Sequence, residues 1–234
     1  MALALSSFAF TAWSATITYP NQAYRFYDGN FSPLPEVFNV KAIAVEGGIV
    51  VAVTRDGKIA TSGFPETWLE DGIVQQLTNV VAVALNYTGG AALTAEGRVI
   101  EIGRRSHEQP ELTNAIAIDA AGQFGDDDLD YRLAVTSDGR VVVWGLYEFG
   151  YPPSAEVPGV VTASGGWSHI LALKNDGTIV QWDTETEPGV VAGLSNVVAV
   201  AAGAEHSVAL KGDGTVVAWG KNHFGQLNVP AGLS

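Results

Sequence analysis

The sequence contains no cysteine among its 234 residues. Disulfides, thiolate nucleophiles and cysteine-based zinc sites are therefore all excluded. Basic residues are also scarce, with 12 Lys and Arg against 25 Asp and Glu, and the formal net charge is −13. Because such a chain is repelled by phosphate backbones and anionic lipids, we expect it to bind no nucleic acid and to insert into no membrane.

Long apolar runs are missing as well, since no run reaches the roughly 18 residues that a membrane helix needs. The first 15 residues, MALALSSFAFTAWSA, have the apolar character of a signal peptide, but no Lys or Arg precedes Arg25. A signal peptide needs a positively charged start, so we predict neither a leader nor a transmembrane segment. The compartment is left open, with the cytoplasm and a virion both compatible.

Helical periodicity is also absent, because Gly or Pro interrupts almost every window of the sequence. What is present is a repeat. Glycines recur 37 to 42 residues apart, and apolar residues alternate on both sides of each, as they do in a β-hairpin. These turn glycines are Gly57, Gly97, Gly139, Gly177 and Gly214. The fullest hairpin is VALKGDGTVVAWG, from Val208 to Gly220, and a strand rich in Ala and Gly precedes each one. A fixed period of about 40 residues with several strands per unit predicts a propeller or a solenoid, all-β and without helices.

The N-terminal segment is a sixth, degenerate copy. Shifted by 193 positions, Ser14 aligns with Ser207 and is followed by a comparable strand. Phe26 aligns with Trp219, and Asn21, which tolerates a left-handed backbone, replaces the turn glycine. We therefore predict a single domain, residues 1–234, of six repeats at approximately 1–37, 38–76, 77–111, 112–156, 157–193 and 194–234.

The fullest unit, residues 196–231 of the last repeat, carries a set of short motifs. They are Ala201-Ala202-Gly203, His206-Ser207, Ala209-Leu210, Asp213-Gly214, Trp219-Gly220 and Gly225-Gln226-Leu227. On these motifs the repeat resembles that of the regulator of chromosome condensation family, and its short period is closest to the bacterial branch typified by β-lactamase inhibitor protein II. The resemblance implies a β-propeller with short blades of three or four strands. Members usually have seven blades and we count six repeats, so a six-bladed ring is favoured, with a seven-bladed or open ring as alternatives.

Proteins on this fold range from nucleotide-exchange factors to enzyme inhibitors, so the fold does not determine the function. Exchange activity toward Ran is not expected of a chain this acidic. We expect a non-enzymatic propeller that binds a protein partner, or packs with its own copies, in a larger assembly such as a virion or an appendage. The alternatives are a soluble proteinaceous enzyme inhibitor and a metal-dependent hydrolase or lyase. We expect no cofactor.

Candidate binding residues lie where one repeat departs from the others. An insertion after Gly122 reads QFGDDDLD, and it brings Asp126, Asp127, Asp128 and Asp130 close together. Carboxylates are ligands that Ca²⁺ prefers, but the spacing is not that of an EF-hand, so we predict a solvated or partner-facing loop and no metal residue.

Three aromatic residues on the loops do not follow the repeat, namely Tyr147, Tyr151 and Trp167. Aromatic side chains on loops are effective anchors for protein contacts. We therefore predict that these three residues and Asp126, Asp127 and Asp128 form the binding surface, with no catalytic residue.

Other conspicuous residues follow the repeat. His169 and His206 both lie eight residues before a turn glycine, so we predict hydrogen bonds within their blades and no metal or acid–base role. Phe149 aligns with Phe31 and Phe224 and is predicted to pack within the repeat.

Overall fold

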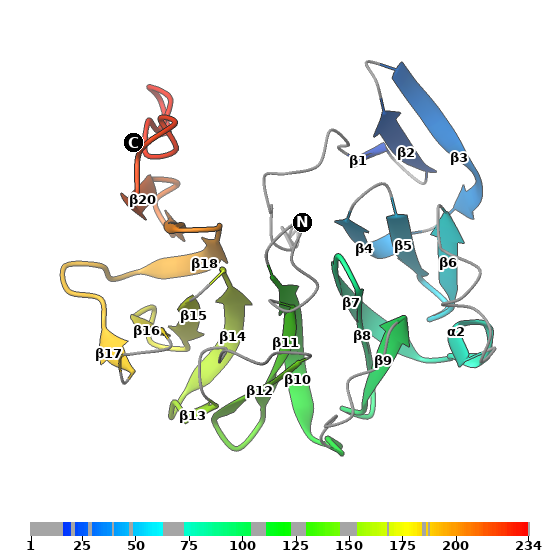
Figure 1. Ribbon diagram of the computed structural model, residues 1–234, viewed down its shortest axis with the longest axis horizontal. Coiled ribbons are helices and arrows are strands. Elements are labelled where there is room, and N and C mark those ends of the chain that lie inside the picture. Colours follow the sequence, from blue (N-terminus) through cyan, green and yellow to red (C-terminus); the bar gives the residue numbers. More distant parts are fainter. Residues whose placement is uncertain are drawn as a thin grey trace.

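Six antiparallel sheets follow one another along the part of the chain that the structure describes, and they form an arc (Figure 1). The structure is a computed structural model. It describes residues 16–19, 22–27, 30–38, 40–46, 49–62, 73–103, 111–122, 130–145, 154–167, 169–183, 186 and 188–233, with the backbone alone for those of 16–38 and for 62, 73 and 75. We call the sheets blades 1 to 6 in chain order.

Every blade is a meander in which consecutive strands pair. Blades 1 to 3 contain β1 (Thr16–Tyr19), β2 (Gln22–Tyr27), β3 (Asn30–Phe38), β4 (Val40–Glu46), β5 (Ile49–Thr54), β6 (Ile59–Ser62), β7 (Val80–Asn86), β8 (Gly89–Thr94) and β9 (Val99–Gly103). Blades 4 to 6 contain β10 (Ala115–Ala121), β11 (Tyr131–Thr136), β12 (Arg140–Gly145), β13 (Ala155–Glu156), β14 (Val160–Gly165), β15 (His169–Lys174), β16 (Ile179–Asp183), β17 (Gly189–Val190), β18 (Val197–Ala202), β19 (His206–Lys211) and β20 (Val216–Gly220). The predicted all-β fold of three- and four-stranded blades is confirmed.

The Ala- and Gly-rich strands β4, β7, β10, β14 and β18 are the inner strands, nearest the middle of the arc in Figure 1. Small residues are needed there because neighbouring blades converge. A Cβ on Gly165 of β14 would lie 2.7 Å from the Tyr131 hydroxyl and 2.8 Å from the Ala121 Cβ, so blade 5 leaves no room for a side chain against blade 4.

The predicted hairpin turns are present in blades 2 to 6, and their glycines have φ between 77° and 90°, which other residues reach only at a cost. In blades 2, 3 and 5 the turn glycine also contacts the start of the next inner strand. The carbonyl of Gly57 accepts from the Val80 amide at 3.0 Å, and that of Gly97 accepts from the Ala115 amide at 2.9 Å. The turns and the starts of the inner strands therefore share one side of the arc, which we call the turn face. The connections that follow the inner strands lie on the other side, the loop face.

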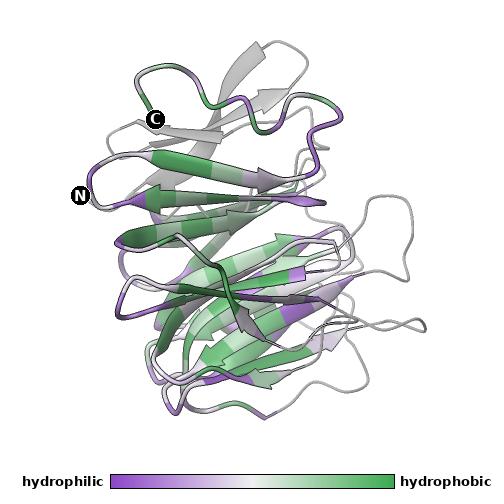
Figure 2. Cartoon of the chain, turned by 90° about the vertical axis from the view of Figure 1, so that its left-hand side faces the viewer, coloured by the Kyte–Doolittle hydropathy of each residue, from purple (hydrophilic) through white to green (hydrophobic). Residues whose placement is uncertain are grey.

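The hydrophobic core lies between adjacent blades. Figure 2 shows hydrophobic residues concentrated in the strands and hydrophilic ones near their ends. Val53 of blade 2 packs with Val80 of blade 3, and Ile170 of blade 5 packs with Tyr131 of blade 4. Each blade thus uses its neighbour to bury its faces.

One expectation is wrong, and a second loses its basis. A one-turn helix, α2 (Ile73–Gln76), precedes blade 3, where its residue Val74 and the following Leu77 are both buried against blades 2 and 3. Phe224, whose alignment with Phe149 is the ground for predicting that Phe149 packs within the repeat, is 92% exposed in a turn after β20. Phe31 and Phe149 lie outside the residues whose side chains are described. Among the described residues, no helix is long and apolar enough to cross a membrane.

Candidate functional site

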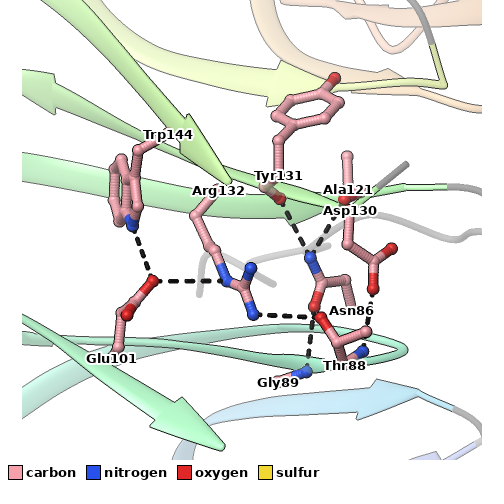
Figure 3. A network of polar contacts seen from close by, with 9 residues as sticks. All are labelled: Asn86, Thr88, Gly89, Glu101, Ala121, Asp130, Tyr131, Arg132 and Trp144. Carbon is pink, nitrogen blue, oxygen red and sulfur yellow. Dashed lines mark hydrogen bonds and ion pairs between the residues drawn. The ribbon is translucent and has the colours of Figure 1, made fainter. Parts of the chain in front are cut away.

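The connection between β7 and β8 is held tightly on the loop face. The side-chain amide of Asn86 donates to the carbonyls of Ala121 and Tyr131, each at 3.1 Å, and its carbonyl oxygen accepts from the Gly89 amide (Figure 3). Asn86 is buried, so its amide is used within the fold, although the sequence fits a glycosylation sequon. Its neighbour Tyr87 is 44% exposed.

The acidic insertion of blade 4 is anchored at its end, next to Gly122 at its start. Asp130, at its end, is buried and accepts a hydrogen bond from the Thr88 amide at 2.9 Å. A Cβ on Gly122, at its start, would collide with this carboxylate. Asp130 is therefore an anchor for the loop, and the expectation that it belongs to a solvated acidic cluster is wrong.

The other aspartates of the insertion, Asp126, Asp127 and Asp128, lie outside the described residues. In the part of the chain that the structure describes, no three His, Cys, Asp or Glu side chains are arranged to hold a metal ion.

A charged network joins blades 3 and 4 beside the connection between β7 and β8 (Figure 3). Arg132 of β11 is 0% exposed, and its Nε lies 3.9 Å from Oε1 of Glu101 on β9. The same carboxylate oxygen accepts from the indole Nε1 of Trp144 at 2.9 Å, and Arg132 Nη2 donates to Thr88 Oγ1 at 3.3 Å.

Electrostatics favour a structural role for this network. Burial lowers the pKa of the Arg132 guanidinium, and the negative charges of Glu101 and Asp130 oppose that shift. The guanidinium remains charged at neutral pH because its ordinary pKa is so high. Since all these side chains are buried, no substrate reaches them, and the network fastens the blades together.

Blades 5 and 6 are joined by a neutral pair. His169 Nε2 and Ser207 Oγ lie 3.0 Å apart, and these residues are 7% and 2% exposed. The predicted hydrogen bond of His169 therefore exists but runs between blades, so the expectation of a bond within the blade is wrong. Although a Ser beside a His can form a nucleophile and base, this pair is too deeply buried to meet a substrate.

The two repeated histidines occupy similar surroundings. The His169 ring lies over Gly166, where a Cβ would approach its Cε1 to 2.5 Å, and the His206 ring lies over Gly203 in the same way. In both repeats the histidine ring therefore packs against a glycine three residues before it. Burial, and to a lesser degree His206, lowers the pKa of His169, while Asp183 raises it.

Trp167 is half-buried in the connection between β14 and β15, and its backbone amide donates to the carbonyl of Ala204 in blade 6 at 3.1 Å. Tyr147 and Tyr151 lie outside the described residues. Tyr87 was not predicted, although it lies ten residues before its turn glycine, as Trp167 does, so alignment of the repeats could have found it. The structure thus places Tyr87 and Trp167 in two connections of the loop face, and it does not bring them together.

Comparisons with known proteins agree with this architecture. A family model described as the regulator of chromosome condensation (RCC1) repeat matches residues 197–226. A search of curated protein sequences finds no match. Two solved structures of yeast RCC1 are similar in fold. One, RCC1 (Prp20) with bound Kap60, has a TM-score of 0.69 at 15% identity over 95% of this chain and 71% of that chain.

The other yeast structure, Prp20p from Saccharomyces cerevisiae, has a TM-score of 0.70 at 16% identity over 94% of this chain and 72% of that one. The binding of Prp20p to Gsp1p and histones was characterised together with that structure. The CRINKLY WD40 ectodomain of the Arabidopsis thaliana receptor kinase ACR4 has a TM-score of 0.61 at 14% identity, over 86% and 73% of the two chains. At these identities the likeness concerns the fold, and the predicted RCC1-like β-propeller repeats are confirmed.

Proposed function

We propose that this RCC1-like β-propeller is a non-enzymatic protein that binds a protein partner through its loop face. The observation that carries the proposal is the exposed Tyr87, held on a connection whose neighbouring side chains are buried and hydrogen-bonded. A rigid support lets such a side chain bind at little entropic cost. Protein binding by yeast Prp20, which is similar in fold, supports the same class of function.

The loops suggest the chemistry of the contact. Aromatic side chains such as Tyr87 and Trp167 bury a large area and have few rotamers to lose, so they serve as anchors. We propose that Tyr147 and Tyr151 add to them, and that Asp126, Asp127 and Asp128 select a partner with basic groups. A larger assembly, such as a virion or an appendage, would make the same use of these loops.

Affinity capture tests the proposal. The chain is immobilised and exposed to an extract of its native source, and the retained proteins are quantified by mass spectrometry. Replacing both Tyr87 and Trp167 by Ala should reduce retention of a specific protein about tenfold or more, because an anchor contributes about 2 kcal/mol. Val190→Ala, at an exposed valine on the outer strand β17, is the matched control and should change nothing.

Two results would count against the proposal: no protein specifically retained, or retention that is equal in the double variant and in wild type. If the retained protein is an enzyme, assaying it with and without the chain distinguishes an inhibitor from a structural partner.

A further inference from the structure

The turn face carries a continuous belt of backbone hydrogen bonds across blades 2 to 6. In addition to the bonds of the turn glycines, the Ala95 amide donates to the Asn79 carbonyl and the Gly212 amide to the Asn196 carbonyl, each at 2.8 Å. Each turn is thereby tied to the start of an inner strand. The belt makes this face a rigid surface.

A row of apolar side chains lies along this belt. The second residue of each inner strand in blades 2 to 6 sits at a bulge, where the pairing with the next strand shifts by one. An extra residue at a bulge is unpaired and turns away from its neighbours. In four blades this residue is a large aliphatic that is 39–56% exposed, namely Val81, Ile116, Val161 and Val198. Blade 2 has an exposed lysine, Lys41, at the same position.

Charge sets this face apart from the rest of the chain. The five turns and the five second positions carry seven basic and five acidic side chains, and the exposed Glu111 and Glu156 lie beside two of the turns, so the face is neutral in a chain of −13. The basic residues are Lys41, Arg55, Lys58, Arg98, Arg140, Lys174 and Lys211. The acidic residues are Asp56, Glu96, Asp138, Asp176 and Asp213. More than half of the chain's 12 basic residues are therefore gathered here.

The acidic residues of the turns serve the turns themselves. Asp176 and Asp213 each accept from a backbone amide two residues on, at 3.0 and 2.9 Å. Hydrogen bonds from Thr178 and Thr215 lower the pKa of these two carboxyl groups. Their ion pairs with Lys174 and Lys211 are 3.5 Å long and partly exposed. Such pairs are weak, so the lysines can turn to a carboxylate of a partner while the aspartates remain bonded to the backbone.

We propose that the turn face is a second docking surface, and that its occupant is a protein segment carrying both apolar side chains and carboxylates. The exposed aliphatic row supplies apolar contact, and the surrounding lysines and arginines supply charge complementarity. Nucleic acid is disfavoured because a phosphate backbone offers nothing to cover Val81, Ile116 and Val161, and the chain as a whole repels it. A second copy, turn face to turn face, is disfavoured because the lysines and arginines of one copy would face those of the other, while the turn aspartates are bonded to their own backbone. The proposal is independent of the loop face and of its partner.

Selection from a displayed library of random peptides tests this proposal. The wild-type chain is the target, and peptides that also bind the Val81→Asp/Val161→Asp variant are removed. We expect enriched peptides with a net negative charge and apolar residues. The best synthetic peptide should bind about tenfold or more weakly to this variant and to Lys41→Glu, measured by fluorescence anisotropy.

Matched variants separate this surface from others. Val190→Asp changes a valine that is 66% exposed on β17, and Lys221→Glu changes an exposed lysine that pairs with Glu205 at the loop face; both should leave peptide binding unchanged. Tyr87→Ala with Trp167→Ala should also leave it unchanged, so a failure of the loop-face proposal is distinguished from a failure of this one. Urea unfolding confirms that each variant is folded.

Three results would overturn the proposal: no enriched peptide, enriched peptides without net negative charge, or binding that Val81→Asp/Val161→Asp does not weaken. Two further assays address other occupants. A dimer in sedimentation velocity that Val161→Asp dissociates would assign the face to a second copy. Binding of fluorescent duplex DNA that the same substitution abolishes would assign it to nucleic acid.

Discussion

The contact between blades 3 and 4 and the contact between blades 5 and 6 have a hydrogen bond at the same repeat positions. One contact is charged and the other is neutral. In both, an indole donates to a side chain of the preceding blade at 2.9 Å, from Trp144 to Glu101 and from Trp219 to Gln181. The two acceptors occupy the same repeat position, four residues after a turn glycine. One acceptor is a carboxylate and the other a neutral amide.

One residue of the following blade accounts for the difference in charge between the two acceptors. It lies seven positions before the turn glycine of that blade. It is Arg132 in blade 4 and Ser207 in blade 6. Where a buried guanidinium is present, the acceptor is Glu, because an unpaired buried charge is costly. Where a hydroxyl is present, the acceptor is Gln and the neutral His169 completes the contact. The repeat thus fixes where the hydrogen bond lies, and the neighbouring side chain decides its charge.

Removing the buried cation should have the largest effect. We expect Arg132→Leu to lower the free energy of unfolding by about 3–5 kcal/mol, because Glu101 is left as an uncompensated buried charge. Adding Glu101→Gln should recover part of the loss by making this contact neutral, like that between blades 5 and 6. Urea unfolding measures both, with the exposed Arg140→Leu as control. A single variant as stable as the control would contradict this account.

Removing the indole donor should have a smaller effect that differs between the two contacts. Trp144→Phe leaves the Glu101 carboxylate without its hydrogen bond, and bonds to charged groups contribute about 1.5–3 kcal/mol. Trp219→Phe removes a bond to a neutral amide, which contributes about 0.5–1.5 kcal/mol, at a half-buried site. Urea midpoints should therefore fall further for Trp144→Phe. Equal losses would show that the charge of the acceptor does not matter.

The neutral contact should be the one that responds to pH near neutrality. Burial lowers the pKa of His169 in the folded chain, so the unfolded chain binds a proton more readily. Stability is then fully present above the unfolded histidine pKa of about 6.5 and is lost as the pH falls below it. Comparing urea midpoints at pH values on either side should show a decrease that His169→Gln abolishes. A urea midpoint that rises on acidification in wild type would contradict a lowered pKa of His169 in the folded chain.

The smallest effect should come from an exposed ion pair of the turn face. Lys58 and Asp56 are 3.3 Å apart, shorter than the 3.9 Å between Arg132 and Glu101, but both side chains are more than half exposed. Water screens such a pair, so Lys58→Ala should leave the urea midpoint unchanged within error. If this variant is as destabilised as Arg132→Leu, burial is not what distinguishes the two pairs.

The features that could be predicted from the sequence are local ones. A turn glycine such as Gly139 needs a positive φ, and alternation on either side of it is visible within a dozen or so residues, so hairpins and blades are recognisable. Inner strands are recognisable because crowding leaves a signature of Ala and Gly. The helix α2 was missed because four residues are too few to show a period.

The polar contacts could not be predicted, because they depend on pairs far apart in the chain. Arg132 meets Glu101 and Thr88 of another blade, and the residues near it in sequence do not indicate these contacts. Asp130 similarly looks like one of several loop aspartates until Thr88 is seen to bond it. The exposure of Phe224 was missed because alignment within the repeat indicates position and not what lies alongside it. The repeat boundaries and the six predicted binding residues stay predictions.

The anchored end of the acidic insertion has a consequence for engineering. Because Asp130 is bonded to blade 3 and lies against Gly122, we expect that the segment between them can be exchanged without altering the core around Arg132. Doubling the length of a flexible loop costs only about 0.6 kcal/mol in closure entropy. The position is therefore suited to grafting foreign recognition sequences, with Asp130 retained so that its bond to the Thr88 amide anchors the end of each graft.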